Sequence, residues 1–211
     1  MKLPFALFSK LFIFPIVGLF VKKIISYQEN IIAQEKLLGK GFVVAVNHIN
    51  SFDHWIISFA LKDKLRDIRF IGALDEPLLW LPSKILYYLA NTISINRKKI
   101  NREDFVKKVV PHLNAGKIVV IDPEGTTNRK KYLLRGKTGA VELAVRAGVP
   151  IVPLGMRKGK GLFGRIVEIG KPMIFKEEDV DDFHKFLREK TDGMMKEISK
   201  ICGKPYPYDN Q

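Results

Sequence analysis

Two histidines and an aspartate lie within eight residues of the sequence, in the stretch NHINSFDH that runs from Asn47 to His54. Imidazole and carboxylate groups this close together can bind a metal ion, act as an acid–base pair, or cap a helix. His48 follows an apolar run, and Asp53 falls in the first turn of the helix expected next. If Asp53 accepts a hydrogen bond from Nδ1 of His48, it fixes the imidazole tautomer and leaves Nε2 as a base.

The same stretch admits two other interpretations. Asn50 and Asp53 have the spacing of a capping box, so Asp53 could simply close the start of a helix. Metal-dependent hydrolases with an H-x-H-x-D-H motif gather ligands on such a loop. Here position 50 is Asn, and Asp53 and His54 come one residue late. We expect His54 on the helix surface, and we expect no metal ion and no cofactor.

A second group of polar residues follows another apolar run. The sequence Ile121-Asp122-Pro123-Glu124-Gly125-Thr126 comes directly after it. Proline and glycine favour a tight turn whose amides can point into a cleft, and the turn offers Glu124 with Thr126 beside it. A plain turn between a strand and a loop is the alternative.

The elements that must position these residues alternate between strands and helices. Strands are predicted at 41–46, 69–71, 92–95, 117–121, 149–154 and 165–169, and helices at 52–64, 77–90, 101–114, 138–147 and about 178–201. This order predicts an α/β fold with a sheet covered on both faces. Because chemistry collects at the carboxyl ends of strands in such sheets, we expect the two polar groups to lie near each other.

The charge of the chain and its N-terminus both indicate an anionic partner. Lys and Arg number 36 against 22 Asp and Glu among 211 residues, a net charge of +14. The basic residues are scattered and form no nucleic-acid recognition motif, so an anionic membrane surface or an acidic carrier protein fits better. Residues 1–25 are rich in phenylalanine and framed by lysines, but Lys10 and Pro15 interrupt them. We expect an interfacial or re-entrant helix, with a true span and a terminal helix packed on its own domain as the alternatives. A chain lacking these residues is expected to fold. The lone cysteine, Cys202, suggests a reducing compartment and no catalytic thiol.

Four motifs in order resemble those of the lysophospholipid (1-acyl-glycerol-3-phosphate) acyltransferase family. They are His48-x4-Asp53, Ile95-Asn96-Arg97, Pro123-Glu124-Gly125-Thr126 and Val149-Pro150-Ile151-Val152-Pro153, with the family-like link Lys137-Thr138-Gly139-Ala140 before the last. The resemblance implies a glycerolphosphate-acyltransferase-like fold with a mixed, mostly parallel sheet. It also implies an N-terminal membrane-associated helical segment, residues 1–38, and an α/β acyltransferase domain, residues 39–211, on the cytoplasmic face of a membrane.

The resemblance further implies transfer of a fatty acyl chain from acyl-ACP or acyl-CoA to the free hydroxyl of a lysolipid. The expected acceptor is 1-acyl-glycerol-3-phosphate, giving phosphatidic acid. His48 would be the general base and Asp53 would orient it. The acceptor would be bound by Arg97, Glu124, Gly125 and Thr126, with Arg129 and Lys137 as further cations.

The sequence departs from the family pattern at three positions. Asp122 stands where the family commonly has Phe, Thr127 where it often has Arg, and the stretch Phe70-Ile71-Gly72-Ala73 before the second motif lacks the family's lysine. The missing cations are those expected to hold an acceptor phosphate, so another lysolipid is an alternative acceptor. A metal-dependent hydrolase and a non-catalytic basic membrane-binding module are the alternatives from other classes.

Overall fold

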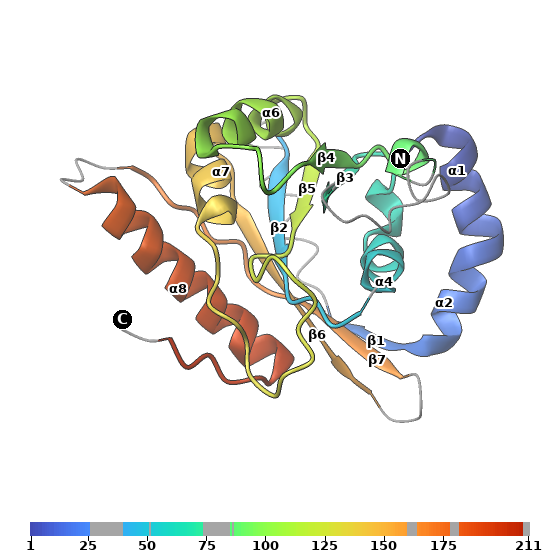
Figure 1. Ribbon diagram of the computed structural model, residues 1–211. Helices are drawn as coiled ribbons and strands as arrows, with labels where there is room; N and C mark the ends of the chain where they lie inside the picture. The colour runs from blue at the N-terminus through green and yellow to red at the C-terminus, as the bar shows by residue number, and fades with distance from the viewer. Residues whose placement is uncertain are drawn as a thin grey trace.

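The computed structural model describes residues 1–25, 40–50, 52–73, 85, 87–159, 164–177 and 182–208, and these form a seven-stranded sheet with helices on both faces (Figure 1). The strands lie in the order β1-β7-β6-β2-β5-β3-β4. Every neighbouring pair is parallel except β6 and β7, which are antiparallel. The sheet is therefore mixed and mostly parallel, as the sequence predicted.

Strands and helices alternate along much of the described chain. The strands are β1 (Val21–Ile25), β2 (Phe42–Val46), β3 (Ile68–Ala73), β4 (Ile93–Ile95), β5 (Ile118–Ile121), β6 (Ile151–Lys158) and β7 (Arg165–Ile169). The helices are α1 (Leu3–Phe8), the π-helix η1 (Ser9–Ile13), α2 (Phe14–Phe20), α4 (Asp53–Ala60), the 3-10 helix η2 (Lys62–Lys64), α6 (Arg102–Asn114), α7 (Gly139–Ala147) and α8 (Phe183–Cys202).

A hydrophobic layer covers each face of the sheet, and β2 contributes side chains to both layers. Phe42, Val44 and Val46 pack against α1, α2 and α4, whereas Val43 and Ala45 pack against α6, α7 and α8. All five residues of β2 are buried, which is why its sequence is an unbroken apolar run instead of an alternating one. Figure 1 shows the two groups of helices on opposite sides of the sheet.

Several predicted boundaries are confirmed by local capping. Asn101 caps α6, because its side-chain oxygen accepts a hydrogen bond from the backbone N–H of Asp104 at 2.8 Å. Gly116 and Gly148 follow α6 and α7 with φ of 72° and 61°, the left-handed conformation that glycine adopts most easily. The strand predicted at 165–169 matches β7.

Other boundaries differ from the prediction. The helix predicted at 52–64 is split into α4 and η2. The strand predicted at 149–154 begins at Ile151 and runs on to Lys158, because its second half pairs with β7. Most of the helix predicted at 77–90, and the predicted start of the last helix at 178, lie outside the described residues.

The N-terminal segment is more closely joined to the sheet than its sequence indicated. α1, η1 and α2 form one continuous helical stretch that passes through Pro15; the π-helical turn before it accommodates the missing N–H. The chain then enters β1, which pairs in parallel with β7 at the sheet edge. Met1, Ala6 and Phe14 are buried in the core. The first 25 residues are thus packed on the α/β fold, and whether the chain folds without them stays a prediction.

Candidate active site

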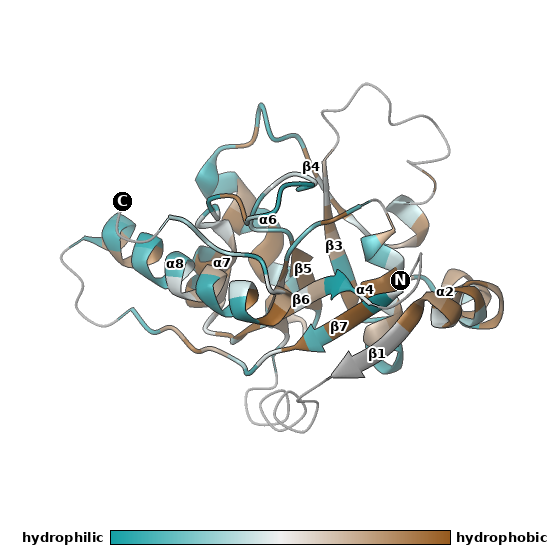
Figure 2. Cartoon of the chain, turned by 90° about the horizontal axis from the view of Figure 1, so that it is seen from below, coloured by the Kyte–Doolittle hydropathy of each residue, from teal (hydrophilic) through white to brown (hydrophobic). Residues whose placement is uncertain are grey.

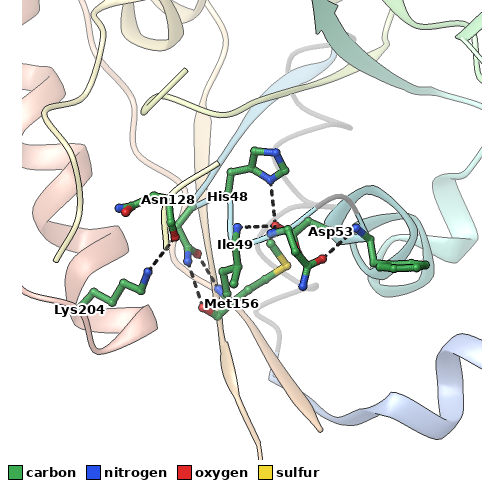
Figure 3. A network of polar contacts seen from close by, with 9 residues as sticks. His48, Ile49, Asp53, Asn128, Met156 and Lys204 are labelled. Carbon is green, nitrogen blue, oxygen red and sulfur yellow. Dashed lines mark hydrogen bonds and ion pairs between the residues drawn. The ribbon is translucent and has the colours of Figure 1, made fainter. Parts of the chain in front are cut away.

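His48 and Asp53 form a hydrogen-bonded pair between β2 and α4. The strand ends at Val46, and the loop places the His48 ring over the first turn of α4 (Figure 3). Nδ1 of His48 lies 2.9 Å from Oδ2 of Asp53. In Figure 3 the other ring nitrogen points away from Asp53. With Asp53 as the acceptor for Nδ1–H, Nε2 is the nitrogen available to a substrate.

Asp53 closes the turn as well as holding the imidazole. The same Oδ2 atom accepts hydrogen bonds from the backbone N–H groups of Ile49, at 2.5 Å, and Asn50, at 2.8 Å. The residue is 1% exposed. The capping and acid–base interpretations of the sequence are therefore compatible, because one buried carboxylate oxygen can serve both.

Two asparagines anchor the loop that carries His48. Asn47 is buried, and its side-chain amide exchanges two hydrogen bonds with the backbone of Met156 in β6, at 2.7 and 3.1 Å. The backbone N–H of Asn128 donates to the carbonyl oxygen of His48 at 2.8 Å. Because both contacts come from segments far along the chain, the tertiary fold sets the position of His48 (Figure 3).

The surroundings of His48 raise its pKa above the ordinary value. Burial alone would lower the pKa, since it disfavours the charged ring. The hydrogen bond that Asp53 accepts from His48 and the negative charges of Asp122, Asp53 and Glu124 outweigh this effect. A higher pKa makes the neutral imidazole a stronger base.

His48 faces a cavity of about 760 Å³. Its lining includes the apolar side chains of Phe5, Trp55 and Phe70 and the polar side chains of Arg97, Thr126 and Lys137, among other residues. A cavity lined by both apolar and basic side chains is suited to an amphipathic ligand. Of the residues predicted from sequence, His48, Arg97, Gly125, Thr126 and Lys137 line this cavity.

The loops that follow β4 and β5 are joined at the cavity. Nη1 of Arg97 donates to the carbonyl oxygen of Gly125 at 3.0 Å. Gly125 has φ of 69°, and a Cβ atom there would meet the side chain of Lys137 at 2.6 Å. The left-handed conformation of this turn favours glycine, whereas the flexible end of the Lys137 side chain can move aside.

Glu124 and Arg129 do not line the cavity in the described part of the chain. Glu124 is 4% exposed, and its Oε2 accepts hydrogen bonds from the Asn128 side chain and from the backbone N–H of Leu134. It therefore supports the loop whose Asn128 in turn holds His48. Arg129 is exposed on the outside of that loop.

Two residues in the sequence stretches singled out above line the cavity, although they were not chosen as site residues. His54 was expected on the helix surface, but it lines the cavity, with its ring edge-on to His48 at 5.8 Å and to Phe70 at 4.7 Å between ring centroids. Asp122 was noted as a departure from the family, and it also lines the cavity. The position of each within a motif was the available signal. Among the described residues, no three His, Cys, Asp or Glu side chains group closely enough to hold a metal ion.

Comparisons with known proteins agree on one family. The family model described as Acyltransferase matches residues 22–157, which is more than half of the chain. The 1-acyl-sn-glycerol-3-phosphate acyltransferase of Haemophilus influenzae is 29% identical over 145 residues, covering 67% of this chain and 55% of that protein. The enzyme of the same name from Escherichia coli is 39% identical over 119 residues, covering 55% and 46%. The chain thus spans about half the length of these curated relatives.

A solved structure shows the same fold. It is the crystal structure of the 1-acyl-sn-glycerophosphate (LPA) acyltransferase PlsC from Thermotoga maritima, with a TM-score of 0.54 and 17% identity. The match covers 85% of this chain and 72% of that one.

Proposed function

Because the chain belongs to the acyltransferase family, we propose that it moves a fatty acyl group from a thioester donor to the free hydroxyl of a lysophospholipid. The observation that carries the proposal is the His48–Asp53 pair in the wall of a cavity that is part apolar and part basic. The first acceptor to test is 1-acyl-glycerol-3-phosphate, the compound in the names of the curated relatives. Its product would be phosphatidic acid.

In the proposed reaction, His48 acts as the general base. Nε2 takes the proton of the acceptor hydroxyl while the oxygen attacks the thioester carbonyl carbon. The carbon–sulfur bond then breaks, and the imidazolium returns the proton to the leaving thiolate. Asp53 holds the ring and stabilises its charged form through Nδ1. No acyl-enzyme is required, which is consistent with the buried position of Cys202.

Basic residues around the cavity support anionic substrates. The loops 96–101 and 125–138 contain no acidic residue, and Arg97 joins them through Gly125. Their exposed cations are Arg97, Lys98, Lys99, Arg129, Lys130, Lys131, Arg135 and Lys137. We propose that Arg97 and Lys137, which line the cavity, engage the acceptor head group. The outer cations would attract the donor, acyl-ACP or acyl-CoA, since both are anionic.

The N-terminal helical stretch is the proposed membrane anchor, on the cytoplasmic face. Leu3–Phe20 is long and apolar enough to cross a membrane, with a mean hydropathy of 2.0, yet one side of it packs on the core. Its other side exposes Leu3, Leu7, Phe8, Leu11, Phe12, Ile16, Leu19 and Phe20. Figure 2 shows this brown, apolar stretch at the edge of the molecule. A helix fixed to its domain along one side fits a position in the membrane interface better than a free span.

The proposal is tested by acyl transfer with the full chain on vesicles that contain lysophosphatidic acid. Thiol release and product mass are followed with acyl-CoA and acyl-ACP. His48→Ala should lower the rate by about 10²–10⁴-fold, the contribution of a general base. His112→Ala is the matched control, because His112 lies on α6 outside the cavity lining. Equal rates for His48→Ala and wild type would contradict the proposal, as would thioester hydrolysis without an acylated lipid.

A further inference from the structure

A second carboxylate, that of Asp122, reaches the cavity beside His48. β2 and β5 are parallel neighbours, with Ala45 opposite Ile121. The two strands therefore end at the same edge of the sheet. Asp122 is the first residue after β5, and His48 is the second residue after β2.

The alternation of side chains places both residues on the same face of the sheet. Ile118 and Val120 of β5 lie in the core layer that contains α4, as do Val44 and Val46 of β2. Asp122 lies two residues beyond Val120, and His48 lies two residues beyond Val46, so the alternation of each strand directs both side chains to this face. Both then line the same cavity.

The fold makes little use of the Asp122 carboxylate. The backbone oxygen of Asp122 accepts a hydrogen bond from Gly125 N–H at 2.9 Å, which fixes the turn. Its carboxylate has no hydrogen bond or ion pair to any described residue. In Asp53 and Glu124 one carboxylate oxygen accepts hydrogen bonds, and the other is buried without a hydrogen-bond partner among the described residues. The carboxylate of Asp122 is instead part of the lining of the cavity that His48 faces, so it is placed to act on groups in that cavity.

The charges around Asp122 come from the turn itself and from α4. Loss of hydration is the largest effect on its carboxyl group and raises the pKa to about 6. The carboxylates of Asp53 and Glu124 act in the same direction, and His48 acts against them. The other ionisable side chains that line the cavity in the described part of the chain are His54, Tyr87, Arg97, Arg102, Lys137 and Glu142.

We propose that Asp122 is a positioning residue that acts through His48. This inference rests on the proposed function. When Nε2 takes the proton of the acceptor hydroxyl, the ring becomes an imidazolium with Asp53 at Nδ1. The ionised Asp122 stabilises this positive charge from the cavity side and so lowers the barrier of the step. The proton returns to the leaving thiolate, and Asp122 itself stays ionised throughout.

The proposal predicts a particular pH dependence. Acyl transfer requires neutral His48, and ionised Asp122 accelerates it. As the pH falls below the raised pKa of His48, the rate should drop tenfold per unit. Below about pH 6 Asp122 also takes a proton, which removes the same stabilisation from the resting imidazolium and from the transition state, so the slope should stay near tenfold per unit.

The test is Asp122→Asn in the full chain, assayed with lysophosphatidic acid vesicles from pH 4.5 to 9. We expect kcat to fall about tenfold or more, the equivalent of one pKa unit of lost interaction, with KM for the acceptor little changed. The acidic limb should shift to lower pH and keep a slope of one throughout. Asp182→Asn, at the exposed cap of α8, should leave the profile unchanged.

A second measurement is independent of activity. The chain has four histidines, so the pKa of His48 can be followed by NMR in wild type, Asp122→Asn and Asp122→Glu. Asparagine should lower that pKa by about one unit, and glutamate should restore much of it. An unchanged His48 pKa, or an acidic limb that stays at the wild-type pH in Asp122→Asn, would overturn the role of Asp122. If His48→Ala were fully active, the proposed function would fail instead, and the NMR result would tell the two failures apart.

Discussion

Asp53→Asn tests how much one buried carboxylate contributes to both stability and catalysis. Oδ2 of Asp53 accepts from the His48 ring and from two backbone N–H groups, at 2.9, 2.5 and 2.8 Å. A charged acceptor makes each such bond stronger than a neutral one by about 1 kcal/mol. Weakening three bonds would therefore cost about 3 kcal/mol of folding free energy. The amide recovers part of this loss, because burying a neutral group in a site that is 1% exposed costs less than burying a carboxylate. We expect a loss of about 2 kcal/mol, or about 4–8 °C in Tm.

The catalytic effect should be larger than the effect on stability. The neutral amide no longer stabilises the imidazolium at Nδ1, and its N–H₂ group can turn toward the ring and favour the wrong tautomer. The corresponding substitution in a Ser-His-Asp triad lowers kcat by about 10⁴. We therefore expect a fall of about 10³–10⁴ in kcat here.

The assay combines thiol release from acyl-CoA on lysophosphatidic acid vesicles with a thermal melt of the same preparation. Asp182→Asn is the matched control, because Asp182 accepts from Lys185 N–H at the exposed cap of α8, where asparagine caps equally well. It should change neither quantity. Activity of Asp53→Asn within tenfold of wild type would refute the argument, even with a lower Tm, because Asp53 would then be a helix cap alone.

Two further predictions follow from the structure. Glu124→Gln should lower stability by about 1–2 kcal/mol, measured by urea unfolding, because it weakens charge-assisted bonds to Asn128 and Leu134. It should also lower kcat more than it raises the acceptor KM, since Asn128 holds the backbone of His48; a pure KM effect would instead place Glu124 on the acceptor. Replacing Leu11 and Phe12, which are 67% and 61% exposed, by glutamine should leave the circular dichroism spectrum unchanged and weaken vesicle co-sedimentation by about tenfold or more. Undiminished sedimentation would mean that the anchor lies elsewhere.

The order of elements and the pairing of His48 with Asp53 could be predicted from the sequence because they depend on local patterns. The unbroken apolar run before His48 reports a strand buried on both faces, whatever its neighbours are. The caps at Asn101, Gly116 and Gly148 report helix ends through backbone conformations that few other residues adopt. The five-residue separation of His48 and Asp53 spans one loop and one helical turn, so their pairing also needs little from the rest of the chain.

The strand pairing could not be predicted in the same way. β1 lies in a segment whose composition indicated a membrane helix, and it is a strand because the edge of β7 is there to pair with it. β6 continues past its predicted end for the same reason, since its last residues pair with the antiparallel β7. Edge pairing depends on a partner far along the chain, which leaves little trace in the local sequence.

The direction of individual side chains at the site was likewise decided by tertiary structure. Glu124 follows β5 in a turn that could offer it to a substrate, yet Asn128 and Leu134 draw its carboxylate inward. His54 and Asp122 enter the cavity wall because α4 packs on the face of the sheet where β2 and β5 end together. The sequence by itself determined which chemical groups arrive at the ends of the strands. Register and helix packing decided which of them face the cavity, because a strand gives successive side chains opposite faces and the packed layers choose between them.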